Sequence, residues 1–154
     1  MIDRIDRKIL RELQADGRIT NQALAEKVGL SPSPCLRRLR KLEDDGVIRG
    51  YTATVDQDRY GLPINAFVSV RLTRQTEDEI SEFDKAIADC EEVLDCYLMT
   101  GTRDYLLRVV ASSLEAYERF LKTRLTRLPC VGSIETSFAL GTIKKTAVYP
   151  ALSD

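Results

Sequence analysis

The sequence predicts an α+β fold in two parts: a small helical unit, then a ferredoxin-like domain with the element order βαββαβ. Apolar residues recur at helical spacing through the first 46 residues. From residue 62 onward, segments with strand-like alternation are interspersed with segments of helical spacing. The net charge also changes sign. Residues 1–50 carry eleven Lys and Arg against eight Asp and Glu, a net +3, and residues 51–154 carry twelve against sixteen, a net −4. A basic first part favours contact with a polyanion.

Composition excludes several classes of function. The chain has 154 residues, no His and no run of about 18 apolar residues that would span a membrane. Without His, neither a Ser-His-Asp or Cys-His nucleophile nor a His-bound metal is expected. No C-x-x-C pair, nucleophile motif or phosphate-binding glycine loop is present, so we expect no enzyme, no metal and no cofactor. No secretory signal is evident, which predicts a cytoplasmic protein whose cysteines are reduced and mostly buried.

Cap and stop residues define two helices at the start of the chain. Asp3 begins the first helix and Gly17 follows its end, whereas Thr20 begins a second, short helix that Gly29 stops. Their predicted inward-facing residues are Ile5, Ile9, Leu10, Leu13, Leu24, Ala25 and Val28.

A third helix is predicted from Ser31 to about Asp45. Both prolines of the Ser-Pro-Ser-Pro run fall in its first turn, where the backbone N–H groups have no helical partner in any case. Gly46 stops this helix. Its predicted inner face consists of Leu36, Leu39 and Leu42.

The outer face of the third helix is basic. Arg37, Arg40 and Lys41 share one face and Arg38 flanks it. A short helix, a turn containing glycine and a basic helix are typical of a helix-turn-helix that reads the DNA major groove. The alternatives are a solvated helix of an ordinary bundle, or a helix-turn-helix for protein contacts, which the basic face disfavours. The candidate DNA contacts are Thr20, Asn21, Ser31, Ser33, Pro34, Arg37, Arg38, Arg40, Lys41 and Arg49.

Residues 47–61 are predicted to be a connection between the two parts. Residues 47–55 alternate in character, which favours an extended wing or linker strand. Arg49 is equally consistent with a phosphate contact and with an ordinary exposed arginine. Gly61-Leu62-Pro63 punctuates the chain. The expected divisions are therefore 1–46 for the helical domain, 47–61 for the wing or linker, and 62–154 for the second domain.

The second domain is predicted from alternating patterns. We expect strands at residues 62–72, 93–99, 104–111 and 133–146, helices at 77–90 and 113–128, and a tight hairpin at Gly101-Thr102-Arg103. Both helices would cover one face of an antiparallel sheet. The predicted helix faces are Ile80, Phe83, Ile87 and Cys90, then Leu114, Tyr117, Leu121, Leu125 and Leu128; the last strand would place Ile134, Phe138 and Leu140 inward.

The opposite sheet face is expected to be apolar and open. Alternation assigns to it Phe67, Tyr97, Met99, Leu107 and Val109. Such a face in a soluble protein predicts association, so we expect a homodimer that forms through the sheets. A dimer also suits a helix-turn-helix, because two recognition helices one duplex turn apart read a near-palindrome.

Three motifs resemble one family. GLSPSPCLRRLRKLEDDGVIRGYTA (residues 29–53), GTRDYLLRV (101–109) and TSFALGTIKKT (136–146) are similar to segments of the Lrp/AsnC, or feast/famine, regulators. The resemblance implies a winged helix-turn-helix and a RAM/ACT-like ferredoxin domain. It also implies dimers that assemble into octamers, binding to double-stranded promoter DNA, and a transcriptional response to an amino-acid effector bound between subunits.

The resemblance also implies an effector site around the hairpin turn. Gly101, Asp104 and Tyr105 match the family's turn motif, with turn N–H groups receiving a carboxylate and Asp104 receiving an ammonium group. Without the resemblance, Gly101 is an ordinary hairpin glycine. The candidate effector contacts are Met99, Thr100, Gly101, Asp104, Tyr105, Thr136 and Ser137. Leu114, Met99 and Ala139 would leave room for an apolar or sulphur-containing side chain.

Overall fold

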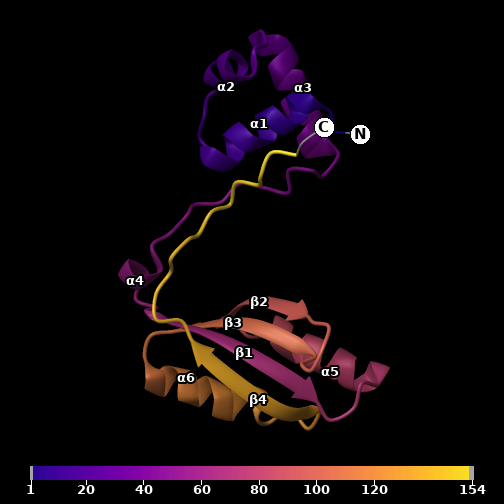
Figure 1. Ribbon diagram of the computed structural model, residues 1–154, viewed down its shortest axis with the longest axis vertical. Helices are drawn as coiled ribbons and strands as arrows, with labels where there is room; N and C mark the ends of the chain where they lie inside the picture. The colour runs from indigo at the N-terminus through magenta and orange to yellow at the C-terminus, as the bar shows by residue number, and fades with distance from the viewer. Residues whose placement is uncertain (1, 153–154) are drawn as a thin grey trace. The chain divides into compact units, whose positions relative to one another are not determined.

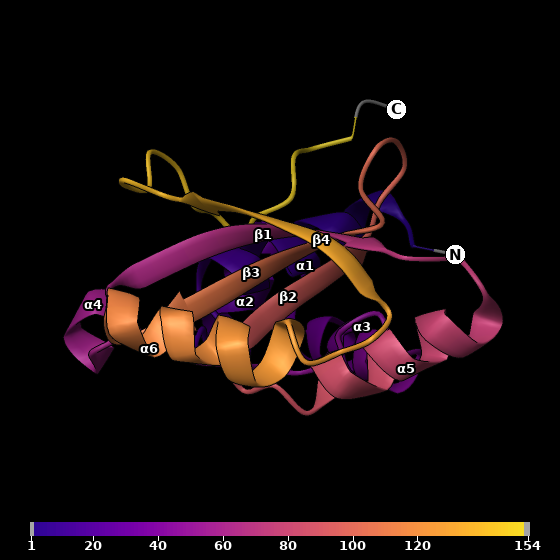
Figure 2. The ribbon, with the colours of Figure 1, turned by 90° about the horizontal axis from the view of Figure 1, so that it is seen from below.

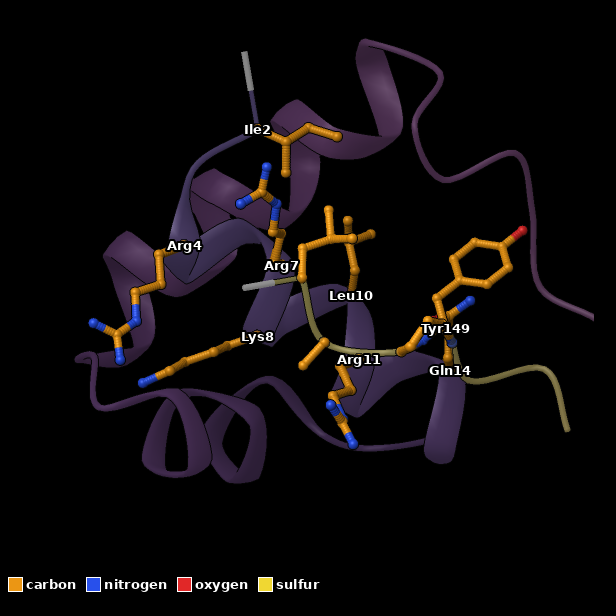
Figure 3. A pocket seen from close by; sticks show the side chains of 11 residues that line it. Ile2, Arg4, Arg7, Lys8, Leu10, Arg11, Gln14 and Tyr149 are labelled. Carbon is orange, nitrogen blue, oxygen red and sulfur yellow. The ribbon is translucent and has the colours of Figure 1, made fainter. Parts of the chain in front are cut away.

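The computed structural model describes residues 2–152, and the chain divides into two compact units (Figure 1). The first unit is Met1–Thr54 together with Ile143–Asp154, and the second is Val55–Thr142. The sequence had suggested that everything after residue 62 forms one domain. In the structure, the residues from Ile143 onward instead group with the N-terminal helices. A contact between residues distant in sequence holds them there: the Gln14 side chain hydrogen-bonds to the backbone at Ala147 and Tyr149, and Figure 3 shows Gln14 beside Tyr149.

Three helices form the first unit: α1 (Arg4–Ala15), α2 (Asn21–Val28) and α3 (Pro32–Asp44). Asp3 caps α1 in a reciprocal capping box with Asp6, and Thr20 caps α2. Gly29 ends α2 in the left-handed conformation, at φ +76°. The core of this unit consists of Ile9, Leu24, Ala25, Val28, Cys35 and Leu42.

The inner face of α3 differs from the prediction. Cys35 and Leu42 are buried and Leu39 is partly buried against them, whereas Leu36 lies beside Arg37 in a surface depression. Positions 35, 39 and 42 follow the four-then-three spacing that keeps residues on one helix face. Two successive steps of three, as in 36, 39 and 42, rotate steadily away from it. Cys35 therefore takes the core position that the sequence analysis had assigned to Leu36.

Residues 47–56 contain no strand. The segment is without helix or sheet pairing, although the Tyr51 hydroxyl donates to Glu43 at 2.8 Å. Burial and the Glu43 carboxylate raise the pKa of Tyr51 to about 12. The predicted wing strand is thus a connection without a sheet ladder in this chain. A short helix that the sequence analysis missed, α4 (Gln57–Tyr60), follows; Asp56 caps it and Gly61 ends it.

The second unit is a four-stranded antiparallel sheet with helices on one face (Figure 2). Its elements are β1 (Ile64–Leu72), α5 (Glu77–Ala88), β2 (Val93–Leu98), β3 (Tyr105–Ala111), α6 (Leu114–Phe120), a π-helical turn η1 (Leu121–Leu125) and β4 (Val131–Phe138). The strand order is β2-β3-β1-β4, as the ferredoxin-like prediction required. Among the described residues, no helix combines the length and apolar character needed to cross a bilayer.

The helix-covered sheet face holds the core of this unit. Phe83 of α5 packs on Tyr105 of β3 with ring centroids 4.3 Å apart. Alternate residues of β1 and β3 complete the layer: Ala66, Val68, Val70, Leu72, Leu107, Val109 and Ala111. Leu107 and Val109 therefore do not lie on the open face, contrary to the prediction. Strand β3 reads Tyr-Leu-Leu-Arg-Val-Val-Ala, and this nearly continuous apolar run conceals its alternation.

The open sheet face is more polar than predicted. The Arg108 guanidinium lies there and donates to Asn65 and Gln57, both at 3.1 Å, and Asp95 is 3.6 Å away. Phe67 and Tyr97 remain exposed on the same face, at 38% and 56%. Burying a charge requires partners, and Arg108 has three. The face thus combines an exposed aromatic patch with a satisfied polar network.

The last helix and strand are shorter than predicted. Leu114, the first residue of α6, is exposed, whereas Tyr117 and Phe120, three residues apart on one face of the helix, are buried. Strand β4 ends at Phe138, so Leu140 is fully exposed instead of facing inward. β4 pairs only with β1, and β1 begins just after Pro63, which has no N–H to extend the ladder. Cys96 is also exposed, whereas the other three cysteines are buried.

Candidate nucleic-acid interface and effector region

The turn between α2 and α3 fixes the direction of the third helix. The N–H of Leu30 donates to the carbonyl of Ala25 at 2.9 Å, and the left-handed Gly29 lets the chain reverse there. Asn21 then joins the two helices, because its Nδ2 donates to the carbonyl of Pro32 at 2.9 Å. The Oδ1 of Asn21 is buried and has no hydrogen-bond partner among residues 2–152. Asn21, a predicted DNA contact, therefore orients α3 from within the unit.

The first turn of α3 presents exposed hydroxyl groups. Ser31 is the N-cap residue, yet its side chain makes no capping hydrogen bond, and Ser33 lies in the first turn. Both residues are exposed and Pro34 is half-buried. Thr20 is exposed, but its hydroxyl is engaged as the cap of α2, accepting from the N–H of Ala23 at 3.2 Å. Pro32 and Pro34 have no N–H and the N–H of Cys35 donates to Ser31, so the N–H of Ser33 and the two serine hydroxyls are the donors that this turn can offer an anionic oxygen.

The outer face of α3 forms a shallow depression with a cationic rim. Arg37 and Arg40 are exposed, and neither has an ion-pair or hydrogen-bond partner within the part of the chain that the structure describes. The residues that line the depression are Ser33, Leu36, Arg37, Arg40, Lys41, Asp44 and Asp45. Arg49, in the segment after α3, is likewise exposed. Two guanidinium groups one helical turn apart are thus free to receive an external ligand.

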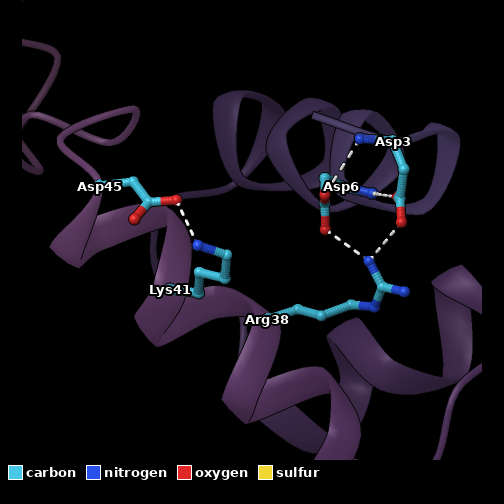
Figure 4. Close-up of polar contacts among 5 residues, drawn as sticks. All are labelled: Asp3, Asp6, Arg38, Lys41 and Asp45. Carbon is cyan, nitrogen blue, oxygen red and sulfur yellow. Dashed lines mark hydrogen bonds and ion pairs between the residues drawn. The ribbon is translucent and has the colours of Figure 1, made fainter. Parts of the chain in front are cut away.

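Arg38, a predicted DNA contact, is held by two carboxylates of its own unit. Its Nη1 donates to Asp3 at 2.6 Å and to Asp6 at 2.8 Å, which ties α3 to the N-terminus of α1 (Figure 4). The pKa of Asp3 is lowered by the N–H of Asp6 and then by Arg38. Lys41 pairs with Asp45 at 2.7 Å on the exposed surface, where an ion pair is weak. Of the four predicted cations of α3, Arg37 and Arg40 are therefore free, Lys41 is in an exposed ion pair, and Arg38 links α3 to α1.

The β2–β3 hairpin turn is closed by backbone hydrogen bonds. The N–H of Met99 donates to the carbonyl of Asp104 at 2.8 Å. Gly101 has φ +98°, a conformation that residues with a Cβ rarely adopt, so glycine is required here by the turn itself. Thr100 and Gly101 are exposed. The tip of the turn is therefore accessible from solvent.

Asp104 is already hydrogen-bonded within its own chain. Its Oδ2 accepts from the N–H of Leu72 and its Oδ1 accepts from Nε2 of Gln75, both at 2.7 Å. These bonds fix the end of β1 against the hairpin. Gln75 was not predicted, because its role depends on the fold of the segment after β1. A ligand's ammonium group would have to share a carboxylate that already has two partners.

The other predicted effector contacts do not gather at the turn within one chain. Tyr105 is buried on the helix-covered face, and its hydroxyl donates to Asp84 at 2.9 Å; burial, then Asp84, raises the pKa of Tyr105. The hydroxyl of Thr136 is hydrogen-bonded to that of Tyr117, on the same face. Ser137 is the next residue along β4 and therefore faces the opposite side. No single surface of one subunit contains all seven residues.

Arg103 is a charged residue of the turn region that was absent from the predicted effector contacts. It belongs to the hairpin turn, and its Nη1 donates to the hydroxyl of Ser69 in β1 at 2.7 Å. The signal was present, since an arginine directly precedes Asp104 in the turn motif. Across residues 2–152, no three His, Cys, Asp or Glu side chains converge in a way that could hold a metal ion.

Comparison with known proteins covers both units. Residues 2–49 match a model of a winged helix-turn-helix DNA-binding domain, and residues 65–149 match a model of the Lrp/AsnC ligand-binding domain. The chain is 46% identical over 149 residues to the Bkd operon transcriptional regulator of Pseudomonas aeruginosa, with 97% of each chain covered. It is 41% identical over 145 residues to the leucine-responsive regulatory protein of Escherichia coli K12, covering 94% of this chain and 88% of the relative.

Solved structures are similar over the same length. A transcriptional regulator from Neisseria meningitidis, solved as a complex with L-Met, has a TM-score of 0.92 at 39% identity, with 97% of each chain covered. An AsnC-family regulator from Agrobacterium tumefaciens has a TM-score of 0.90 at 39% identity, with 96% of each chain covered.

Proposed function

The chain belongs to the Lrp/AsnC family of transcriptional regulators, and we propose that it binds operator DNA through Arg37 and Arg40 and responds to an amino acid at the Gly101 turn. It is a DNA-binding regulator and not an enzyme.

One observation carries the DNA part: Arg37 and Arg40 stand free on the exposed face of α3, whereas Arg38 is held by two carboxylates. A helix in the major groove can place such arginines against guanine O6 and N7 as bidentate donors. Ser31 and Ser33 at the start of the helix would then meet a phosphate, and Arg49 a neighbouring one. Base contacts give sequence specificity, and phosphate contacts give position along the duplex.

The effector part rests on the accessible turn and on the family. Thr100 and Gly101 are exposed at a glycine turn, and Arg103 supplies a cation beside them. A free amino acid carries a carboxylate that such a turn can receive. We favour an apolar or sulphur-containing amino acid because the similar Neisseria regulator is a complex with L-Met. Since Tyr105, Thr136 and Ser137 point elsewhere in one chain, a second subunit would complete the site.

Association would proceed through the open sheet face. Phe67 and Tyr97 are exposed there, and burying aromatic area stabilises an interface. We propose a homodimer through this face, dimers that assemble into octamers as the family resemblance implies, and a cytoplasmic location with the DNA. The molar mass in solution, measured by light scattering during size exclusion, tests the assembly. A monomer at micromolar concentration would contradict it.

Binding-site selection from a random duplex library tests the DNA proposal, because no operator has to be assumed. The selected duplex is then titrated by fluorescence anisotropy at several salt concentrations, where log affinity should fall linearly with log salt. Arg37→Ala should weaken binding and relax specificity at one base position, whereas Arg119→Ala, an exposed arginine of α6, should change nothing. If Arg37→Ala and Arg40→Ala both bound as tightly as the unsubstituted protein, the assignment would be wrong.

A thermal-shift panel of the twenty amino acids tests the effector proposal. We expect at least one apolar or sulphur-containing member to raise the melting temperature, because a ligand that binds only the folded state stabilises it. Gly101→Ala should abolish that shift by straining the turn. No shift with any amino acid would remove the effector assignment and leave DNA binding standing.

A further inference from the structure

The outer face of α1 carries a groove that neither the DNA interface nor the effector region uses. Ile2 and Leu10 line this groove on one side, and residues 149–152 of the C-terminal tail line it on the other. Figure 3 shows Tyr149 and Gln14 together at one end of the groove and Ile2 at the other, with Arg4 and Lys8 extending to one side. The C-terminal tail of the same chain therefore packs beside α1 and forms one wall of this groove.

Gln14 recognises the backbone of the tail. Its Nε2 donates to the carbonyl of Ala147 at 2.7 Å, and its Oε1 accepts from the N–H of Tyr149 at 3.1 Å. In extended chain, the carbonyl of one residue and the N–H two residues later point to the same side. One side-chain amide satisfies both, as a residue of a neighbouring parallel strand would. This pairing is specific for an extended segment and independent of its side chains.

The docked tail connects the two units a second time. The chain first passes between them near Thr54 and returns near Ile143. Between the end of β4 at Phe138 and the docked Ala147, residues 139–146 have no helix or strand, and Leu140 and Ile143 are fully exposed. Docking at Gln14 therefore shortens the free connector between the last strand of the sheet and the DNA-binding unit.

We propose that the outer face of α1 is a docking site for the chain's own C-terminal tail, and that the docked tail restricts the motion of the DNA-binding unit so that a dimer engages two half-sites together. The second clause rests on the proposed DNA binding by a dimer. Restricting a tethered module raises the effective concentration of the second binding event without adding any contact to DNA. Binding to one isolated half-site gains nothing from it.

Hydrogen exchange tests the docking without DNA. The Tyr149 amide should exchange several-fold more slowly in the unsubstituted protein than in Gln14→Ala, because the substitution removes its acceptor. Gln22→Ala, an exposed glutamine of α2, is the matched control and should leave Tyr149 unchanged. Residues 147–152 carry no charge, so the slow exchange should persist in high salt. Equal exchange in all three proteins would overturn the docking site.

A mixed sample decides which chain supplies the tail. Gln14→Ala chains are assembled with chains that end at Lys145, so that only a tail from one chain on α1 of another can dock. Slow exchange at Tyr149 in that mixture would overturn the assignment to the same chain, and fast exchange supports it. If the shortened chain does not fold, Gln14→Ala alone still tests the groove, because alanine favours the helix that it would occupy.

DNA affinity tests the consequence. With duplexes carrying one or two copies of the selected half-site, Gln14→Ala should lose roughly 3- to 10-fold affinity for the double site and none for the single site. An equal loss on both duplexes, or none on either, would overturn the proposed restriction. If the unsubstituted protein did not prefer the double site, the proposal that a dimer binds two half-sites would be wrong. The hydrogen-exchange measurement would still test whether the tail docks on α1.

Discussion

Two of the predicted DNA contacts on α3, Arg37 and Arg40, stand clear of their own chain, whereas at the Gly101 turn most of the predicted effector contacts are hydrogen-bonded within it. Arg37 and Arg40 are exposed without partners among the described residues. Asp104, in contrast, holds both Leu72 and Gln75. A helix displays a binding face by periodicity alone. A turn between strands must satisfy the backbone groups at the sheet edge, so its polar side chains are already hydrogen-bonded when no ligand is bound.

The largest expected effect is on DNA binding. The double substitution of Arg37 and Arg40 by alanine removes two contacts of about 1–3 kcal/mol each, a loss of roughly 30-fold or more in affinity for the selected duplex. The melting temperature should stay unchanged, because neither side chain has a partner in its own unit. Anisotropy titration and calorimetry check the two halves of this statement. A double variant with a lower melting temperature and unchanged DNA affinity would show that Arg37 and Arg40 stabilise the fold and do not bind DNA.

Asp104→Ala should act on the fold of the second unit. The substitution leaves the partly buried N–H of Leu72 without its acceptor, which costs about 1–3 kcal/mol. Asp104→Asn retains an acceptor oxygen and should cost less. Urea unfolding of both variants measures the difference. Full stability of Asp104→Ala would show that the carboxylate is free for a ligand after all, which would remove the contrast with α3.

Tyr105→Phe tests whether this motif residue serves the core. Its hydroxyl donates to the exposed Asp84, so its loss should cost only about 0.5–1.5 kcal/mol. The amino-acid response in the thermal-shift panel should persist, because the ring is buried away from the turn. Loss of that response with stability intact would place Tyr105 at the effector after all.

The smallest effect is a dependence on pH in the first unit. The pKa of Asp3 is lowered in the folded state from its ordinary value of 3.8, chiefly by the N–H of Asp6 and then by Arg38. Its contribution to stability is therefore present above pH 3.8 and is lost as the pH falls through the lower, folded value. Calorimetry at successive pH values should show this loss, reduced in Arg38→Gln. If the unsubstituted protein and Arg38→Gln lost stability identically as the pH falls, Arg38 would not contribute to lowering the pKa of Asp3.

Sequence periodicity was sufficient for the helices of the first unit and for the order of elements in the second. It failed where a partner is distant. Arg38 and its partner Asp3 are 35 residues apart, and Gln14 and Ala147 are 133 residues apart, so no local pattern could connect them. The apolar run of β3 also hid which residues face the helices, and this placed Leu107 and Val109 on the wrong side.

The effector region was the least predictable part for a related reason. Motif matching located the turn at Gly101, but side-chain direction depends on strand register, which turned Thr136 toward Tyr117 and Ser137 away from it. The family resemblance supplied the list of residues, and only the fold could show which of them one chain brings together. Arg103 became visible through its hydrogen bond to Ser69.

The most direct test of the account compares Arg37→Gln with Arg38→Gln on the same selected duplex, at a temperature where both proteins are folded. The two residues are neighbours and the substitutions are identical, so only their surroundings differ. We expect Arg37→Gln to lose affinity with an unchanged melting temperature, and Arg38→Gln to melt earlier while still binding DNA. The opposite pattern, with Arg38→Gln losing binding and Arg37→Gln losing stability, would contradict the account.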